Sequence, residues 1–544
     1  MTITIYRAAR IITMNPMNPE ATHVAVRDGR ILGAGPLEDL TGWGPHTVDN
    51  RFADKILMPG LVEGHCHLME GALWAHTYVG YFDRTAPDGT VHRGCKTLDD
   101  VLDRLKGVAA EGGDGPLAAW GLDPIYFDTG RVGRDQLDAV TQDRPIGIMH
   151  ASGHILNVNS NALDLGGLMR AGVNHPGVPL GDDGLPTGEL KGPDVMSPVS
   201  IHVGFDRDML ACDEAGMWKF ARLCIRAGVT TATDLAARLL DEAVELMLKV
   251  TGDRRFPARI VPLRYHHGVA PEDLIAHAMR LRPRSTDKLR LGRIKVVVDG
   301  SIQGFSARLR EPGYYNGAPN GLWYITPEHL DYILRHALAD DLQVHTHTNG
   351  DQATQLVLDT IERVLRDHPA RDHRTTLQHC QLADTAQFRR MARLGMCANL
   401  FANHHFYWGD QHYALTVGPE RAERMNAAAT ALREGVPMAI HSDAPITPLG
   451  PFFTGWAACT RQTASGRTLG ARERITLDQV LYAITLGAAF TLKLDGEVGS
   501  IEAGKRADFA ILEDDPYELG AERLRDMRVW GTVLGGDVFE AAAA

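Results

Sequence analysis

Eight short apolar runs, each ending in small or polar residues, recur along the central part of the chain, with stretches of helical character between them. This alternation is typical of parallel β/α units, and eight such units close a parallel sheet into a barrel. The sequence therefore predicts an α/β protein with a (β/α)8 TIM barrel, in which functional side chains gather at the carboxyl ends of the strands. The eight runs are Ile56–His67, Val229–Leu235, Ala258–His266, Arg293–Asp299, Gln343–Thr348, Thr375–Gln381, Met396–Ala402 and Pro437–Asp443.

The two ends of the chain differ from the barrel region and predict a second, smaller domain. Residues 1–55 look like short strands broken by turns, and Asp28-Gly29 is a signal for a β-hairpin. Residues 491–544 have the same character, so we expect both ends to form one small β-sandwich. The barrel would then span 56–490, with a long insertion at about 72–225 after its first strand.

Composition argues against nucleic acid and membranes as partners. The chain has 56 basic and 68 acidic residues, a formal net charge of −12, which disfavours binding to anionic surfaces. The sequence contains no apolar run of transmembrane length and no signal-peptide pattern at its start. The seven cysteines are scattered and include no CxxC pair, as expected in a reducing compartment. We therefore expect a cytoplasmic protein that acts on a small molecule.

The strongest local signal is the motif Glu63-Gly64-His65-Cys66-His67 at the end of the first apolar run. Residues two apart on a strand point to the same face, so His65 and His67 can bind one metal ion while Cys66 points away. Two hydrogen-bonded polar histidines are the alternative explanation of this pair.

Three later strand ends carry residues of the same chemical kind. His347, His379 and Asp443 each follow a β-like run. Imidazoles and carboxylates are ligands that zinc, manganese and iron accept, so the set predicts a metal centre. Taken alone, Asp443 has a structural alternative, because an aspartate before Pro445 is also suited to cap a helix.

Lys295 lies inside an otherwise apolar strand, where an unpaired ammonium group would be costly to bury. One explanation is an ion pair with Asp299 on the same face of the strand. The functional alternative is that carbon dioxide carbamylates Lys295, which would convert its amine into an anionic carboxylate able to bridge two metal ions.

Taken together, these positions resemble the amidohydrolase superfamily and, within it, the amidohydrolase-3 family, which includes YtcJ-like proteins and N-substituted formamide deformylases. The resemblance extends over nearly the whole chain and includes Gly499–Asp508, which looks like this family's return into its β-sandwich. The motifs that carry it are Pro59-Gly60-Leu61-Val62-Glu63-Gly64-His65-Cys66-His67, Ile294-Lys295 with Asp299-Gly300-Ser301, His347 with Gly350-Asp351, His379, and Ser442-Asp443-Ala444-Pro445.

The resemblance implies a divalent metal cofactor, most simply zinc, with one or two ions per subunit. The ligands of the first ion would be His65, His67 and Asp443. A second ion would lie between His347 and His379, with carbamylated Lys295 as the bridge. Members of the family are commonly oligomeric, so a homo-oligomer is a further expectation.

Other residues are candidates with open alternatives. His345 shares the strand parity of His347, so spacing alone does not choose between them, whereas alignment on Gly350-Asp351 favours His347. The resemblance makes His154 in the insertion a substrate-binding candidate, and its alternative is a surface or helix-capping role.

A second group of candidates follows the last two strands. The run His404-His405-Phe406-Tyr407-Trp408 suggests His405 and Trp408 as residues that line a substrate pocket, with loop packing as the alternative. The same alternative applies to His441, which precedes Asp443 on the same face.

The predicted reaction is hydrolysis of a non-peptide C–N bond in a small molecule, with an N-substituted formamide or a similar amide as the best expectation. A metal-activated hydroxide would attack the carbonyl, and Asp443 would act as general base and then general acid toward the leaving nitrogen. A deaminase or cyclic-amide hydrolase on the same barrel is one alternative. Deaminases, however, typically place a glutamate beside a histidine strand end, and the segments after His347 and His379 lack one. A third possibility is a ligand-binding or regulatory barrel without catalysis.

Overall fold

The computed structural model describes residues 2–127, 130–205 and 212–543, and the chain divides into two compact units. The larger unit comprises Met1–His67, Ala221–Ala444 and Leu449–Ala544, and the smaller unit comprises Leu68–Phe220 with Pro445–Pro448. The barrel and the β domain both belong to the larger unit, whereas the insertion forms the smaller one.

A sheet of eight parallel strands is the centre of the larger unit, with the strand order β19-β18-β17-β16-β15-β14-β13-β5. Just beyond the two edge strands, Cys66 pairs with Ala444, and the backbone N–H of Asp443 donates to the carbonyl oxygen of His65 at 3.0 Å. The predicted (β/α)8 barrel is therefore confirmed, and its two edges meet beside candidate ligands. The strands are β5 (Leu61–Glu63), β13 (Val229–Ala237), β14 (Arg259–Tyr265), β15 (Arg293–Val297), β16 (Val344–Thr348), β17 (Thr376–His379), β18 (Cys397–Leu400) and β19 (Met438–Ile440).

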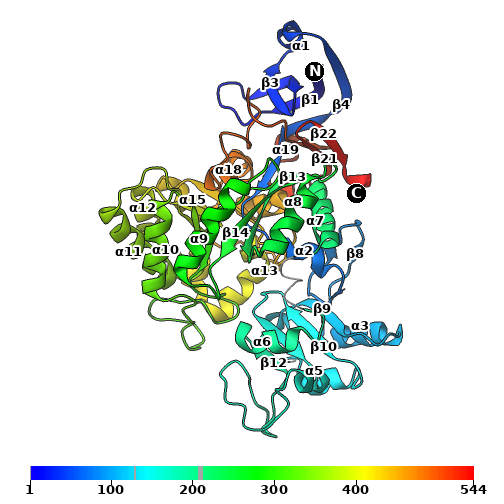
Figure 1. Cartoon of the computed structure of the whole chain (residues 1–544), viewed down its shortest axis with the longest axis vertical. Coiled ribbons are helices and arrows are strands. Elements are labelled where there is room, and N and C mark those ends of the chain that lie inside the picture. Colours follow the sequence, from blue (N-terminus) through cyan, green and yellow to red (C-terminus); the bar gives the residue numbers. More distant parts are fainter. Residues whose placement is uncertain (1, 128–129, 206–211, 544) are drawn as a thin grey trace. The chain divides into compact units, whose positions relative to one another are not determined.

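Helices connect successive strands and cover the outside of the barrel (Figure 1). In α11, Val357, Ile361 and Val364 are buried at the helical spacing that packs one face against the sheet. Helix α7 (Glu214–Ala227) precedes β13. The other connecting helices are α8 (Asp241–Gly252), α9 (Pro271–Leu281), α10 (Pro327–Ala339), α11 (Asp351–Asp367), α12 (Thr385–Arg393), α13 (His404–Gln411), α14 (Gly418–Arg424), α15 (Ala428–Arg433), α16 (Pro451–Thr460), α17 (Leu477–Ala483) and α18 (Leu486–Thr491).

The first apolar run is divided between two sheets, so its prediction as one barrel strand is wrong in extent. Ile56–Pro59 is the end of β4 (His46–Pro59) in the β domain, and only Leu61–Glu63 joins the barrel. Gly60 separates the two strands at a point where a Cβ atom would lie 2.0 Å from Thr230 Oγ1. Only glycine leaves room for this approach, so the chain passes from one sheet to the other here.

Both ends of the chain build one seven-stranded sheet with the order β22-β21-β20-β4-β1-β2-β3, and Figure 1 shows the blue and red ends on the same side of the barrel. The predicted pairing of the two chain ends is thus observed, as one sheet, whereas the domain bounds 1–55 and 491–544 stay predictions. The predicted hairpin at Asp28-Gly29 connects β2 to β3, and the φ angles of 55° and 72° are the left-handed pair of a type I′ turn. Besides β4, the strands are β1 (Ile3–Ile12), β2 (Glu20–Arg27), β3 (Arg30–Gly35), β20 (Phe509–Leu512), β21 (Val529–Leu534) and β22 (Asp537–Glu540).

A buried ion pair joins the barrel to the β domain. Arg259 Nη1 lies 2.6 Å from Asp508 Oδ2, and both side chains are almost completely buried. Removal of one partner leaves an uncompensated charge, so we expect Asp508→Ala to lower the free energy of unfolding by about 3–5 kcal/mol. Urea unfolding measures this, with Arg255→Ala, which removes an exposed arginine, as the control that should unfold like the wild type. Unchanged stability of the Asp508 variant would contradict the prediction.

The smaller unit has its own sheet, with the order β12-β11-β10-β9-β6, and its own apolar core around Trp120, Leu156 and Leu190. Its strands are β6 (Thr77–Tyr78), β9 (Leu117–Leu122), β10 (Ile146–His150), β11 (Ile155–Val158) and β12 (Glu189–Lys191), and its main helices are α3 (Leu98–Ala110), α5 (Ser160–Leu165) and α6 (Pro193–Ser200). Among the described residues of the whole chain, no helix combines the length and apolar character needed to cross a bilayer.

Candidate metal centre

His65, His67 and Asp443 converge beyond the ends of β5 and β19. Asp443 Oδ1 lies 3.2 Å from His65 Nε2 and 3.3 Å from His67 Nε2, and each residue offers a ligand atom within 4.8 Å of the other two. Among the described residues, Asp443 Oδ1 has no hydrogen-bond partner. Two imidazole nitrogens and a carboxylate oxygen aimed at one point are the donor set that a divalent ion accepts, so these residues fit the predicted ion.

The orientation of His65 is set by a neighbour that sequence reasoning missed. Gln378 Oε1 lies 2.8 Å from His65 Nδ1, which places the ring proton on Nδ1 and leaves the Nε2 lone pair facing Asp443. Burial, reinforced by nearby Lys295, holds the pKa of His65 well below its ordinary value, so this ring is neutral, as a ligand must be. Gln378 immediately precedes His379, and only the inter-strand geometry identifies it.

His67 and Asp443 form a coupled pair. Burial lowers the pKa of His67, but contacts with Asp234 and Asp443 outweigh this effect and raise it to about 9. Burial also raises the pKa of Asp443 above its ordinary value. His67 therefore carries a proton near neutral pH that an ion would displace on binding. Asp234 Oδ1, 3.8 Å from His67 Nδ1, supports the outer side of the ring.

Backbone strain accompanies two of the candidate ligands. His379 has a φ of 71° and Asp443 a φ of 57°, in the left-handed region that costs a non-glycine residue about 1–3 kcal/mol. Asp443 does not cap a helix, because the next helix, α16, begins at Pro451 with Gly450 as its N-cap. The helix-capping alternative is therefore wrong, and the strained backbone directs this carboxylate toward the histidines.

His347 and His379 meet as a second pair. His347 Nδ1 lies 2.9 Å from His379 Nε2, and their rings contact edge to face. His345 is instead fully buried, with its Nδ1 2.8 Å from Gln378 Nε2. Between these two histidines, it is therefore His347 that lies beside His379, as the prediction requires.

Lys295 is buried in β15, and its ammonium nitrogen pairs with no carboxylate in the described part of the chain. Asp299 instead accepts backbone N–H groups from Arg308, Asn349 and Gly350 at 2.8–3.0 Å, so the predicted alternative of a Lys295–Asp299 ion pair is wrong. Among the described residues, Lys295 Nζ has no hydrogen-bond partner. Burial lowers its pKa to about 7, and Asp443 partly opposes this effect, so much of the amine is neutral near pH 7.

Glu63 holds the two edges of the barrel together behind the ligands. Its Oε2 accepts from Ser442 Oγ at 2.9 Å, and its Oε1 accepts from the backbone N–H groups of Ser442 and His65 at 3.2 and 3.3 Å. Burial raises the pKa of Glu63 to about 8. The acid of the histidine motif thus positions the segments that carry His65 and Asp443, a role that sequence spacing did not indicate.

The three substrate-binding candidates lie in different surroundings. His405, on α13, is buried, with Nε2 3.0 Å from the carbonyl oxygen of Ala457 on α16, so this contact connects two helices. Trp408, also on α13, is buried and stacks on His404 at 4.5 Å. His154 is half-buried in the smaller unit just before β11, and desolvation lowers its pKa. Substrate binding by these residues stays a prediction.

The comparisons with known proteins agree with this geometry. The model of the amidohydrolase family matches residues 53–539. The chain belongs to the amidohydrolase family. It is 27% identical to the N-substituted formamide deformylase of Arthrobacter pascens, over 97% of this chain and 96% of that protein. It is 26% identical to the YtcJ protein of Bacillus subtilis, over 98% of both chains.

A solved structure extends the comparison to the fold. A metal-dependent hydrolase from Pyrococcus horikoshii superposes with a TM-score of 0.72 at 18% identity, over 96% of this chain and 99% of that chain. The amidohydrolase resemblance and the barrel fold are thus confirmed, and the family supports a metal-dependent hydrolase.

Proposed function

We propose that this amidohydrolase hydrolyses a non-peptide C–N bond of a small molecule at a metal centre formed by His65, His67, Lys295, His347, His379 and Asp443. The observation that carries the proposal is the Asp443 carboxylate, which lies within 3.3 Å of both histidines of the first motif. A divalent ion, most simply zinc, would polarise the substrate carbonyl and lower the pKa of a water molecule.

Asp443 supplies the proton transfer in this proposal. Because Oδ1 lies beside His65 and His67, the other carboxylate oxygen, Oδ2, would accept the proton from the attacking water. The same carboxyl group then gives the proton to the leaving nitrogen, so that an amine departs and a carboxylic acid remains.

An N-substituted formamide, or a similar small amide, is the substrate that we propose. This substrate class is supported by the similarity of the chain to the Arthrobacter N-substituted formamide deformylase along nearly the whole length of both proteins. Turnover of a panel of formamides, larger amides, cyclic amides and aminopurines, with and without prior chelation, tests the proposal. Formamide cleavage that disappears on chelation and returns with zinc, manganese or cobalt is the expected result. Preferred release of ammonia from aminopurines would favour a deaminase, and metal binding without any turnover would favour a ligand-binding barrel.

Lys295 should decide whether the centre holds one ion or two. Its buried, partly neutral amine is suited to react with carbon dioxide, and the resulting carboxylate would present one oxygen to each ion. We expect Lys295→Ala to retain at most one ion per subunit, and acetate or propionate to restore part of the activity. Metal analysis of the purified variant measures this.

The matched control is Lys288→Ala. Lys288 donates to the backbone carbonyls of Asp253, Arg254 and Phe256, away from the candidate ligands, so its loss should change stability but not metal content. An unmodified Lys295 in a fully active, two-ion enzyme would refute the bridge.

The cellular setting is part of the same proposal. All seven cysteines are buried and none forms a disulfide with another described residue, which supports a reducing cytoplasmic compartment. The acidic net charge of −12 supports a small-molecule substrate rather than nucleic acid or an anionic membrane. A homo-oligomer stays a prediction that light scattering can test.

A further inference from the structure

His441 is a fully buried histidine without an assigned role. Its side chain has no exposed surface, and among the described residues neither ring nitrogen has a hydrogen-bond partner. The ring is stacked between His65, at 4.6 Å, and Phe401, at 4.9 Å. A buried imidazole with both nitrogens unsatisfied is costly and calls for a partner outside the polypeptide.

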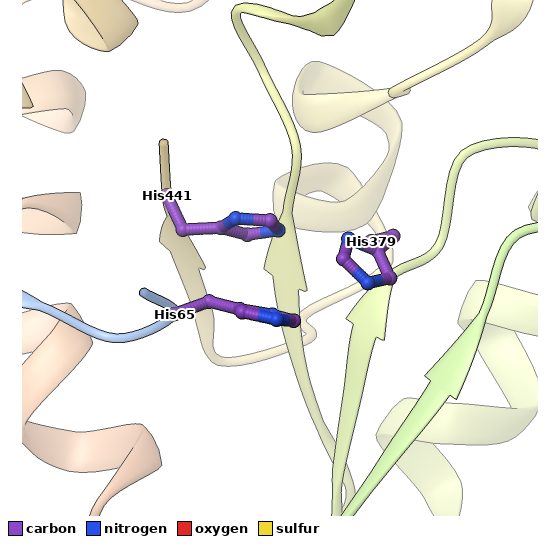
Figure 2. A group of neighbouring side chains, drawn as sticks. All are labelled: His65, His379 and His441. Atoms are coloured by element: carbon purple, nitrogen blue, oxygen red, sulfur yellow. The ribbon is translucent and has the colours of Figure 1, made fainter. Parts of the chain in front are cut away.

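Two other imidazoles face His441. Figure 2 shows the rings of His65 and His441 one above the other, with His379 beside them. Each of the three residues offers a nitrogen within 4.8 Å of the other two. His379 directs its Nε2 toward His347, and its Nδ1 has no hydrogen-bond partner among the described residues.

The three histidines are more deeply buried than His67 and Asp443. His65 and His441 are 2% and 0% exposed, whereas the side chains of His67 and Asp443, two residues further on, are 16% and 10% exposed. The group of His65, His379 and His441 offers only imidazole nitrogens, whereas the group of His65, His67 and Asp443 also offers a carboxylate.

We propose that the barrel has an alternative ion position, formed by His65, His379 and His441, which competes with the position formed by His65, His67 and Asp443. The inference rests on the part of the proposed function that places a metal ion in the barrel. His65 belongs to both sets, and its Nδ1 is engaged by Gln378, so only Nε2 can bind an ion. One imidazole nitrogen binds one ion, and the two positions therefore exclude each other.

The two positions differ in the ions that they favour. Three imidazoles suit Cu²⁺ and Ni²⁺. The position formed by His65, His67 and Asp443 contains a carboxylate and therefore suits Mn²⁺ better. The identity of the ion would thus decide whether Asp443 coordinates it. With an ion at the three histidines, the Asp443 carboxylate coordinates no ion. The kind of ion bound would therefore change the surroundings of Asp443, the residue proposed to transfer the proton.

Two variants with opposite expectations test the proposal. His441→Phe keeps the ring stack but removes both nitrogens, and it should weaken Cu²⁺ binding by about 10–100-fold or more while Mn²⁺ binding stays as in the wild type. His67→Ala should lose Mn²⁺ and keep Cu²⁺. Titration of the ion-free full chain with each metal measures these affinities, and neither measurement requires turnover.

Spectroscopy of the wild type keeps the test decisive if a variant does not fold. Electron paramagnetic resonance of Cu²⁺ bound to protein with ¹⁵N-labelled histidine should show three coordinated nitrogens, and His441→Phe should show two. The control is His404→Phe, because His404 packs on the same Phe401 ring at 4.8 Å but belongs to neither set. Its metal affinities should equal those of the wild type.

The outcomes separate this inference from the proposed function. If Cu²⁺ in the wild type is coordinated by only two nitrogens, the three-histidine position does not exist. The same conclusion follows if each variant changes the Cu²⁺ and Mn²⁺ affinities equally. In both cases the hydrolase proposal stands. If neither metal binds the wild type, the proposed metal centre itself fails.

Discussion

Asp443→Asn should lower kcat by about 10²–10⁴-fold while the protein stays folded. The amide cannot accept the proton from water, and it is a weaker ligand than a carboxylate. Its size is the same, and Asp443 makes no helix cap, so the left-handed backbone at this position can persist. Steady-state kinetics and metal analysis of the variant measure both effects.

Asp410→Asn is the matched control for this variant. Asp410, on α13, accepts hydrogen bonds from Thr463 and Ser465 rather than facing the candidate ligands, so kcat should stay within about threefold of the wild type. A near-normal kcat in Asp443→Asn with unchanged metal content would show that the carboxylate is not the proton carrier.

His65→Ala should abolish turnover together with ion binding by the two groups that contain His65. His65 contributes to both groups of potential ligands, so its loss leaves neither group with three donors. Loss of a metal ligand costs more than the 10–100-fold typical of a supporting contact, and we expect activity below detection at ordinary metal concentrations. Metal content after dialysis and activity with added zinc, manganese or cobalt measure the result.

The control for His65→Ala is His329→Ala, which removes an exposed histidine on α10. This variant should retain its metal and its activity. Full activity of His65→Ala, or of wild-type protein freed of metal by chelation, would overturn the proposed hydrolysis at a metal centre.

Much of the architecture is determined locally in the sequence. Each apolar run is short and rich in residues that favour strands, and each is followed by a helical pattern, so periodicity alone identified the eight barrel strands. Parallel strands have their carboxyl ends at one edge, and for this reason His347, His379 and Asp443 could be assigned to one site from positions far apart in the chain. The Asp28-Gly29 hairpin was equally local, because two consecutive left-handed residues favour this pair.

The partner of each buried polar group was decided only by the tertiary structure. Spacing placed Asp299 near Lys295, but loop backbone groups from Arg308, Asn349 and Gly350 take that carboxylate instead. Parity could not separate His345 from His347, because the choice depends on which side chain of the neighbouring strand faces each ring.

Three other contacts of the site also depend on segments that lie far apart in the sequence. Gln378 orients His65 across 313 residues of sequence, and Glu63 reaches Ser442 across 379. The burial of His441 between His65 and Phe401 likewise depends on three separate strand ends. Local pattern determines that a strand forms and which face turns inward, whereas hydrogen-bond partners depend on inter-strand register and packing, which join segments that the sequence keeps far apart.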